Sequence, residues 1–157
     1  MQQGLIHLHN LLRWFILIFA LWTIVKSAGG MGGNKPFTKG DKRPALLLMI
    51  TADIQLLLGL ILYFTGAWGI KNVNNMGGFG AIMKDKASRF WGVEHITGML
   101  VALVLIHIGY SVIKKDIADG TKFKKLFWYT FLALVIIIAT IPWPFREVVG
   151  RPLFPGM

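Results

Sequence analysis

Two histidines and two charged residues lie inside otherwise apolar stretches of this sequence. His9 and Arg13 belong to the first stretch, and Glu94 and His95 are adjacent at the start of the third. Neutral imidazole is a common metal ligand, and arginine and glutamate can hold a cofactor or each other. Ionisable side chains inside membrane-spanning segments are costly, so each is a candidate functional residue. These four residues form the first candidate site.

A further carboxylate and a further histidine form a second candidate group. Asp53 lies in the second apolar stretch and His107 in the third. An aspartate and a histidine inside a membrane either join two helices through a structural hydrogen bond or relay protons. The sequence leaves both alternatives open for this secondary polar pair.

Four apolar stretches position these side chains, at residues 5–25, 45–65, 90–113 and 126–141. Roughly 20 apolar residues are needed to cross the hydrocarbon core of a bilayer. The sequence therefore predicts an all-α membrane protein, in which four transmembrane helices form an up-down-up-down bundle and residues 1–157 form a single domain. A cleaved signal peptide is not expected, because no Lys or Arg precedes the first stretch and no A-x-A site follows it.

The composition agrees with this class and excludes others. Apolar residues make up 55% of the chain and charged residues only 15%, which excludes a disordered chain. The absence of cysteine excludes disulfides, thiolate metal sites and covalently attached c-type haem. A net charge of +10 would suggest nucleic-acid binding in a soluble protein. Here the positions of the basic residues explain the net charge without a nucleic-acid partner.

The basic residues lie mainly in two of the three loops. Ten Lys and Arg lie within 26–43 and 114–125, which share one side of a four-span protein, against six on the side of the termini. The positive-inside rule places the more basic loops in the cytoplasm. We therefore expect a multi-pass protein with both termini outside the cytoplasm.

Depth and helical angle bring the first candidate group together. At a rise of about 1.5 Å per residue, His9 lies about 6 Å below the outer face of the membrane and Arg13 about 12 Å below it. Glu94 and His95 lie about 6–8 Å below the same face. Asp53 and His107 lie about 12 and 9 Å from the inner face. His9 shares a stripe with Arg13 and the small Ala20, opposite a bulky face that includes Trp14 and Trp22 and is expected to contact lipid.

In such a bundle the first and third helices are diagonal, with axes roughly 11–14 Å apart. This distance suits two imidazoles that bind one haem iron from opposite sides. Small residues on the side of His95, at Gly98, Ala102 and Gly109, predict close contact with a neighbouring helix. The alternatives are another metal ion, or a structural cluster in which Arg13 forms an ion pair with Glu94. His7 is expected to be an interfacial anchor.

Several motifs resemble those of a known group. They are HLHNLLRW, KPFTKGD, IQLLLGLILYF, FWGVEH and IPWP, and they extend over nearly the whole chain. They resemble the small four-helix bacterial inner-membrane proteins catalogued as cytochrome b-like. The resemblance implies a b-type haem (heme b) carried by His9 and His95, and a role near the respiratory chain. Members of the group tend to have a histidine where this chain has Asp53, which argues against a second haem or metal site.

The leading functional hypothesis is a cytochrome b-like protein of the bacterial inner membrane that binds one b-type haem between its first and third helices. It would transfer electrons between quinol and a respiratory partner in the lipid bilayer. The alternative is a non-enzymatic accessory subunit of a larger membrane complex. With short loops and no soluble domain, the chain is not expected to be a complete enzyme on its own.

Overall fold

The computed structural model describes residues 2–154, and these residues are all helix, turn or loop. Four long helices are α1 (Gln2–Ala28), α2 (Lys39–Thr65), α6 (His95–Val112) and α7 (Asp119–Thr140). A π-helical segment, η1 (Phe90–Glu94), leads directly into α6. The connection between α2 and η1 contains the short helices α3 (Ile70–Asn75), α4 (Phe79–Ile82) and α5 (Lys86–Arg89).

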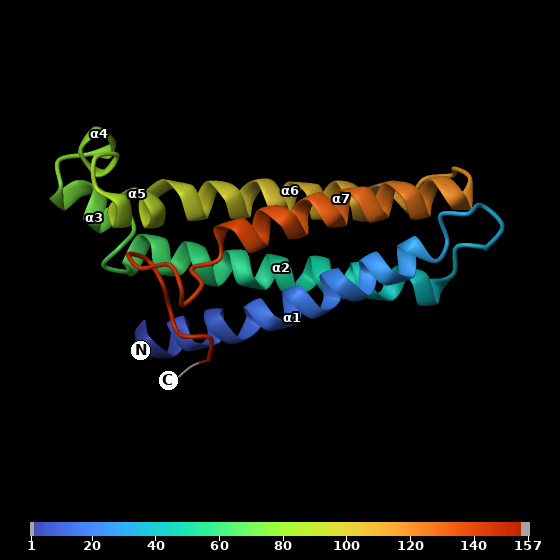
Figure 1. The fold of residues 1–157 in the computed structure, drawn as a ribbon, viewed down its shortest axis with the longest axis horizontal. Helices are drawn as coiled ribbons and strands as arrows, with labels where there is room; N and C mark the ends of the chain where they lie inside the picture. Colours follow the sequence, from blue (N-terminus) through green and yellow to red (C-terminus); the bar gives the residue numbers. More distant parts are fainter. Residues whose placement is uncertain (1, 155–157) are drawn as a thin grey trace.

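The four long helices form an antiparallel bundle, as predicted. Helix α1 packs against α2 and α7, and α6 packs against the same two helices, so α1 and α6 are diagonal. Both ends of the described chain lie at one end of the bundle, together with α3–α5 (Figure 1). We call this the termini end. The opposite end, formed by connections 29–38 and 113–118, is the basic end.

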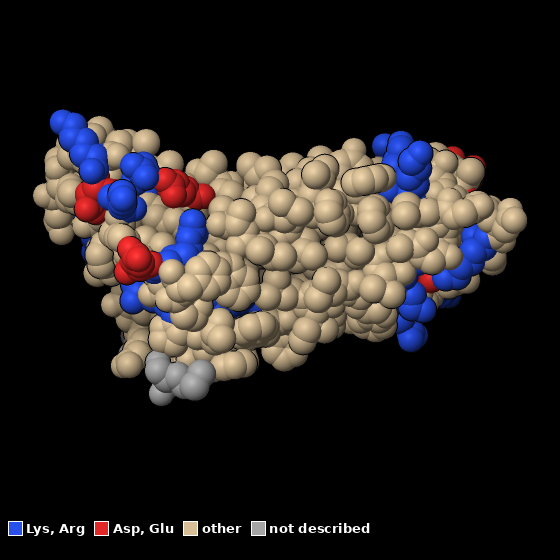
Figure 2. Space-filling view, viewed as in Figure 1, with Lys and Arg blue, Asp and Glu red and all other residues tan. Residues whose placement is uncertain are grey.

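All four long helices are long and apolar enough to cross a membrane. In Figure 2 the blue and red charged residues gather at the two ends, and the middle of the visible face is free of them. Large apolar side chains such as Leu11, Ile18 and Trp22 are exposed on the outside of the bundle. This arrangement is that of a multi-pass membrane protein surrounded by lipid.

Helices α2 and α7 begin six and seven residues before the apolar stretches that predicted them. Helix α2 begins at Lys39 because Asp41 caps it: its carboxylate accepts hydrogen bonds from the Thr38 amide at 3.1 Å and the Thr38 hydroxyl at 2.7 Å. Helix α7 begins at Asp119, whose carboxylate accepts a hydrogen bond from the Phe37 amide at 3.0 Å. Hydropathy detects only the part of a helix that suits hydrocarbon, so the polar first turns of α2 and α7 lie outside the predicted stretches.

Small residues bring α6 and α7 together, as predicted. A Cβ added at Gly98 would lie 2.4 Å from Cγ2 of Thr140, and one added at Gly109 would lie 3.1 Å from Cβ of Tyr129. Ala102 is 1% exposed. Close backbone approach of this kind replaces the hydrophobic driving force that helices lack in lipid.

Candidate functional site

A cavity of about 420 Å³ runs from the termini end toward the middle of the bundle. All four long helices line it, together with the segment that follows α7. Most of its wall is apolar, and its polar side chains include His9, Arg13, Gln55, His95 and Arg151. A volume of about 300–1,000 Å³ with an apolar wall and a few convergent polar groups is typical of ligand and cofactor sites.

His9 and His95 face each other across this cavity. Their ring centres are 6.3 Å apart and their ring planes make an angle of 64°. His9 comes from α1 and His95 from the first residue of α6, the two diagonal helices. The juxtaposition expected from depth and helical angle is therefore present.

The main-chain carbonyl of Thr140 orients His95. Its oxygen lies 2.9 Å from Nδ1 of His95, so Nδ1–H donates the hydrogen bond and Nε2 is the free ring nitrogen. The carbonyl is available because Thr140 is the last residue of α7, and the last carbonyls of a helix have no partner within it. An imidazole that donates its other N–H to a main-chain carbonyl is the usual arrangement of a metal-ligating histidine.

The π-helical segment η1 ends immediately before His95. The amide of His95 donates to the carbonyl of Phe90, five residues earlier. This wider turn changes the angular relation between His95 and the residues before it, and π-turns of this kind are frequent at functional sites. The rings of Phe90 and Trp91 pack 5.8 and 5.7 Å from that of His95. Together these contacts fix the position of the imidazole.

His9 lies in a space made by a glycine on α2. A Cβ added at Gly59 would lie 3.3 Å from Cε1 of His9. The side-chain amide of Gln55 donates to the carbonyl of His9 at 2.9 Å. Within residues 2–154, Nδ1 of His9 and Oε1 of Gln55 are buried without a hydrogen-bond partner. Both side chains line the cavity, so a group bound there would supply partners for these atoms.

Arg13 binds the segment after α7. Its guanidinium donates to the carbonyl of Leu153 at 2.8 Å, and the indole of Trp14 donates to the same oxygen at 3.0 Å. The ring of Trp14 also stacks on Phe154 at 5.3 Å. The C-terminal segment therefore half-buries Trp14, whereas Leu11, Ile18 and Trp22 on the same face are exposed as expected.

The predicted ion pair between Arg13 and Glu94 is also wrong. Glu94 pairs with Arg89, with 2.6 Å between Nε and Oε1, and its side chain is exposed outside the cavity. Glu94 is the last residue of η1, whose wider turn changes the direction expected from an uninterrupted α-helix. His7 is half-buried and does not line the cavity.

Arg151 lines the cavity but is absent from the site predicted from the sequence. It follows α7 by eleven positions, and its guanidinium carbon lies 5.1 Å from the centre of the Trp91 ring. In the sequence, Arg151 indicates only membrane orientation, as one of the six basic residues on the side of the termini. The motif IPWP indicates where α7 ends but gives no direction for the chain after it, so the sequence carried no signal for this placement.

Asp53 and His107 form the expected pair. Nε2 of His107 lies 2.7 Å from Oδ1 of Asp53, joining α6 to α2. Their side chains are 44% and 42% exposed, so the pair lies at the outer surface of the bundle and not in the cavity. This placement separates it from the site of His9 and His95.

Among residues 2–154, no group of three or more His, Asp or Glu side chains could hold a metal ion. Comparison with known proteins gave no match to a protein-family model, to a curated protein or to a solved structure.

Proposed function

We propose that this chain is a cytochrome b-like electron carrier of the bacterial inner membrane. His9 and His95 would hold one b-type haem in the cavity, and the chain would transfer electrons between quinol and a respiratory partner. A b-type haem supplies reversible one-electron chemistry at its iron. The protein's own residues hold it, exclude water and determine its potential.

The distance between the two imidazole rings carries this proposal. Two imidazoles on opposite sides of one metal ion have ring centres about 6–6.5 Å apart, because a metal–nitrogen bond is about 2.0–2.1 Å long. The ring centres of His9 and His95 are 6.3 Å apart. A pair of histidines also suits haem iron, for which the protein would supply two donors, whereas a zinc ion takes three or four.

The chain's other polar groups suit the same ligand. Arg13 and Arg151 line the cavity together with apolar side chains of all four long helices. A b-type haem is an apolar macrocycle with two carboxylates, and guanidinium groups bind carboxylates through paired hydrogen bonds. Arg13 and Arg151 would therefore bind the two carboxylates, while Thr140 keeps His95 oriented.

An absorption spectrum of the purified protein tests the proposal. In mild detergent, the dithionite-reduced protein is expected to show b-type bands with about one haem per chain. A preparation that folds in cells supplied with haem and lacks these bands would refute it. Haem-free protein that purifies with other membrane proteins would instead support the accessory-subunit alternative.

The proposed orientation places both termini outside the cytoplasm. The chain contains no cysteine, so a single introduced cysteine reports its own location. Asn34 and Asn74 are exposed, one in the connection at the basic end and the other in α3. In intact spheroplasts, a membrane-impermeant maleimide is expected to label Asn74→Cys and to label Asn34→Cys only after lysis. The reverse pattern would contradict this orientation.

A further inference from the structure

The basic end of the bundle carries far more positive than negative side chains. Ten Lys and Arg lie at or next to this end, against three Asp. Asp41 pairs with Lys35, with 2.7 Å between Oδ1 and Nζ. Asp119 pairs in the same way with Lys122 at 3.1 Å, and Asp116 forms no ion pair within the described residues. The other eight basic residues therefore have no acidic partner in the described part of the chain.

Two of these eight residues meet on one aromatic ring. Nζ of Lys42, from α2, lies 5.6 Å from the centre of the Tyr110 ring, and Nζ of Lys114, after the end of α6, lies 4.5 Å from the same centre. Tyr110 is 6% exposed, so its ring is held in the packed part of the bundle. The ring attracts each ammonium group, but the two like charges repel each other. An anion bound between them would remove this repulsion.

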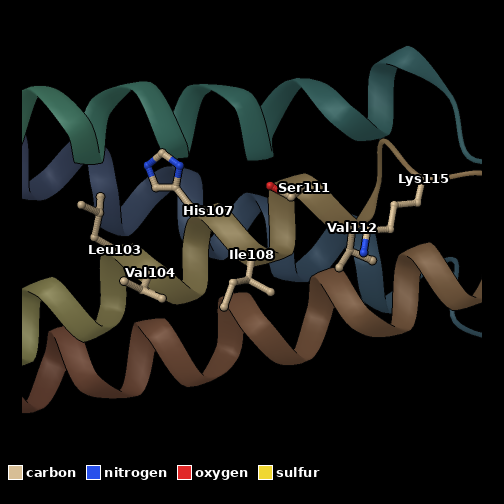
Figure 3. A pocket seen from close by; sticks show the side chains of 7 residues that line it. All are labelled: Leu103, Val104, His107, Ile108, Ser111, Val112 and Lys115. Carbon is tan, nitrogen blue, oxygen red and sulfur yellow. The ribbon is translucent and has the colours of Figure 1, made fainter.

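An apolar groove of about 400 Å³ reaches the same end of α6. It is lined by α6 and the turn that follows: Leu103, Val104 and Ile108 form its apolar part, and Ser111 and Lys115 lie at its basic end. In Figure 3 the side chain of Lys115 extends back along α6 toward the groove. Lys115 directly follows one of the two converging lysines. The groove therefore connects the lipid-facing surface of α6 with the positive charges.

We propose that Lys42, Lys114 and Tyr110 form a binding site for one anionic phospholipid, which we call the lysine site. The phosphate of the lipid is bound by the two ammonium groups, and one acyl chain follows the groove along α6. Charge complementarity selects this occupant, because unpaired lysines at a membrane surface attract anionic head groups. The choline of a zwitterionic lipid would add a positive charge beside the two lysines. The lysine site lies at the opposite end of the bundle from His9 and His95, so the proposal does not depend on haem.

Native mass spectrometry of the delipidated full chain in neutral detergent measures the binding of single lipid molecules. The probes are phosphatidylglycerol and phosphatidylcholine with identical acyl chains, titrated separately. One phosphatidylglycerol is expected to bind about tenfold more tightly than phosphatidylcholine, because each lysine near the head group strengthens the attraction. Inorganic phosphate at millimolar concentration is not expected to displace the lipid, because it has no acyl chain for the groove to hold.

Two double variants separate the lysine site from the general charge of the basic end. Lys42→Gln with Lys114→Gln is expected to weaken phosphatidylglycerol binding about tenfold, to the level of phosphatidylcholine. The matched control is Lys124→Gln with Lys125→Gln, which removes the same charge from two exposed residues outside the lysine site and the groove. Its affinity is expected to equal that of the unchanged protein.

Thermal unfolding checks that each variant is folded. Should the double variant of the lysine site unfold, Lys114→Gln alone replaces it, because Lys114 is exposed. This single change is expected to weaken binding about fivefold. Lys42→Arg with Lys114→Arg keeps both charges and is expected to retain the preference for phosphatidylglycerol.

Three results would overturn the inference. Equal binding of the two lipids would mean that the groove alone holds an acyl chain. Equal losses in the two double variants would mean that only the total charge of the basic end matters. Displacement by inorganic phosphate would mean that the lysines bind a free anion. Each of these results leaves the haem spectrum unaffected, so failure of this inference is distinguishable from failure of the proposed function.

Discussion

Replacing either His9 or His95 with alanine is expected to abolish the reduced b-type spectrum. Each substitution removes one of the two facing imidazoles, whose ring centres are 6.3 Å apart. Loss of a residue that only orients a metal ligand costs about 10–100-fold in affinity, so loss of the ligand itself is expected to cost more than about 100-fold. Haem titration of the apoprotein, followed by absorption, measures this change.

His7→Ala is the matched control for His9→Ala. It removes an imidazole from the same helix two residues away, and His7 does not line the cavity. Its spectrum and haem affinity are expected to equal those of the unchanged protein. Unaltered b-type bands in both His9→Ala and His95→Ala would show that these residues are not the ligands.

Added imidazole separates loss of a ligand from loss of the fold. His95→Ala leaves a space beside Phe90 and Trp91, whose rings pack against the native imidazole. Free imidazole at millimolar concentration is expected to restore b-type bands in this variant, because the remaining wall and His9 are unchanged. An unfolded variant would not recover in this way.

The approach of His9 and His95 could be predicted because straight helices follow simple rules. Rise per residue gave the depth of each histidine, and helical angle gave the face of α1 that carries His9, Arg13 and Ala20. The structure buries Arg13 and Ala20, and His9 lines the cavity. The same rules gave the contact of Asp53 with His107, because both lie in uninterrupted helix.

The errors lie where the backbone departs from a straight helix. Glu94 belongs to a π-helical segment, and its partner is Arg89 instead of Arg13. Arg13 binds Leu153 in a segment whose path depends on contacts between residues about 140 positions apart. Periodicity carries no information on either feature. Nor did it reveal the exposure of Asp53 and His107, since helical angle does not specify which face the bundle covers.

Gly98→Ala is expected to destabilise the protein, although alanine has a higher helix propensity than glycine. Alanine is normally favoured over glycine inside a helix by about 0.5–1 kcal/mol. At Gly98, however, the new Cβ would lie 2.4 Å from Cγ2 of Thr140. Overpacking of this kind typically costs about 1–3 kcal/mol. Thermal unfolding in detergent measures the loss, and Gly4→Ala is the control, because nothing lies within 4 Å of a Cβ at Gly4.

The same substitution tests the role of Thr140 in positioning His95. The hydroxyl of Thr140 donates to the carbonyl of Ile136 at 2.7 Å, so the side chain cannot turn away without losing a hydrogen bond. Displacing Thr140 also displaces the carbonyl that accepts from Nδ1 of His95 at 2.9 Å. Haem affinity of Gly98→Ala is therefore expected to fall about 10–100-fold, as for other residues that orient a metal ligand.

A second substitution should reverse both effects if the contact with Thr140 causes them. Thr140→Ser removes only the methyl group that clashes and keeps the hydroxyl bonded to Ile136. Gly98→Ala combined with Thr140→Ser is expected to recover most of the stability and haem affinity, so the two changes will be strongly non-additive. Additive losses would mean that the close contact of α6 with α7 does not determine the position of His95.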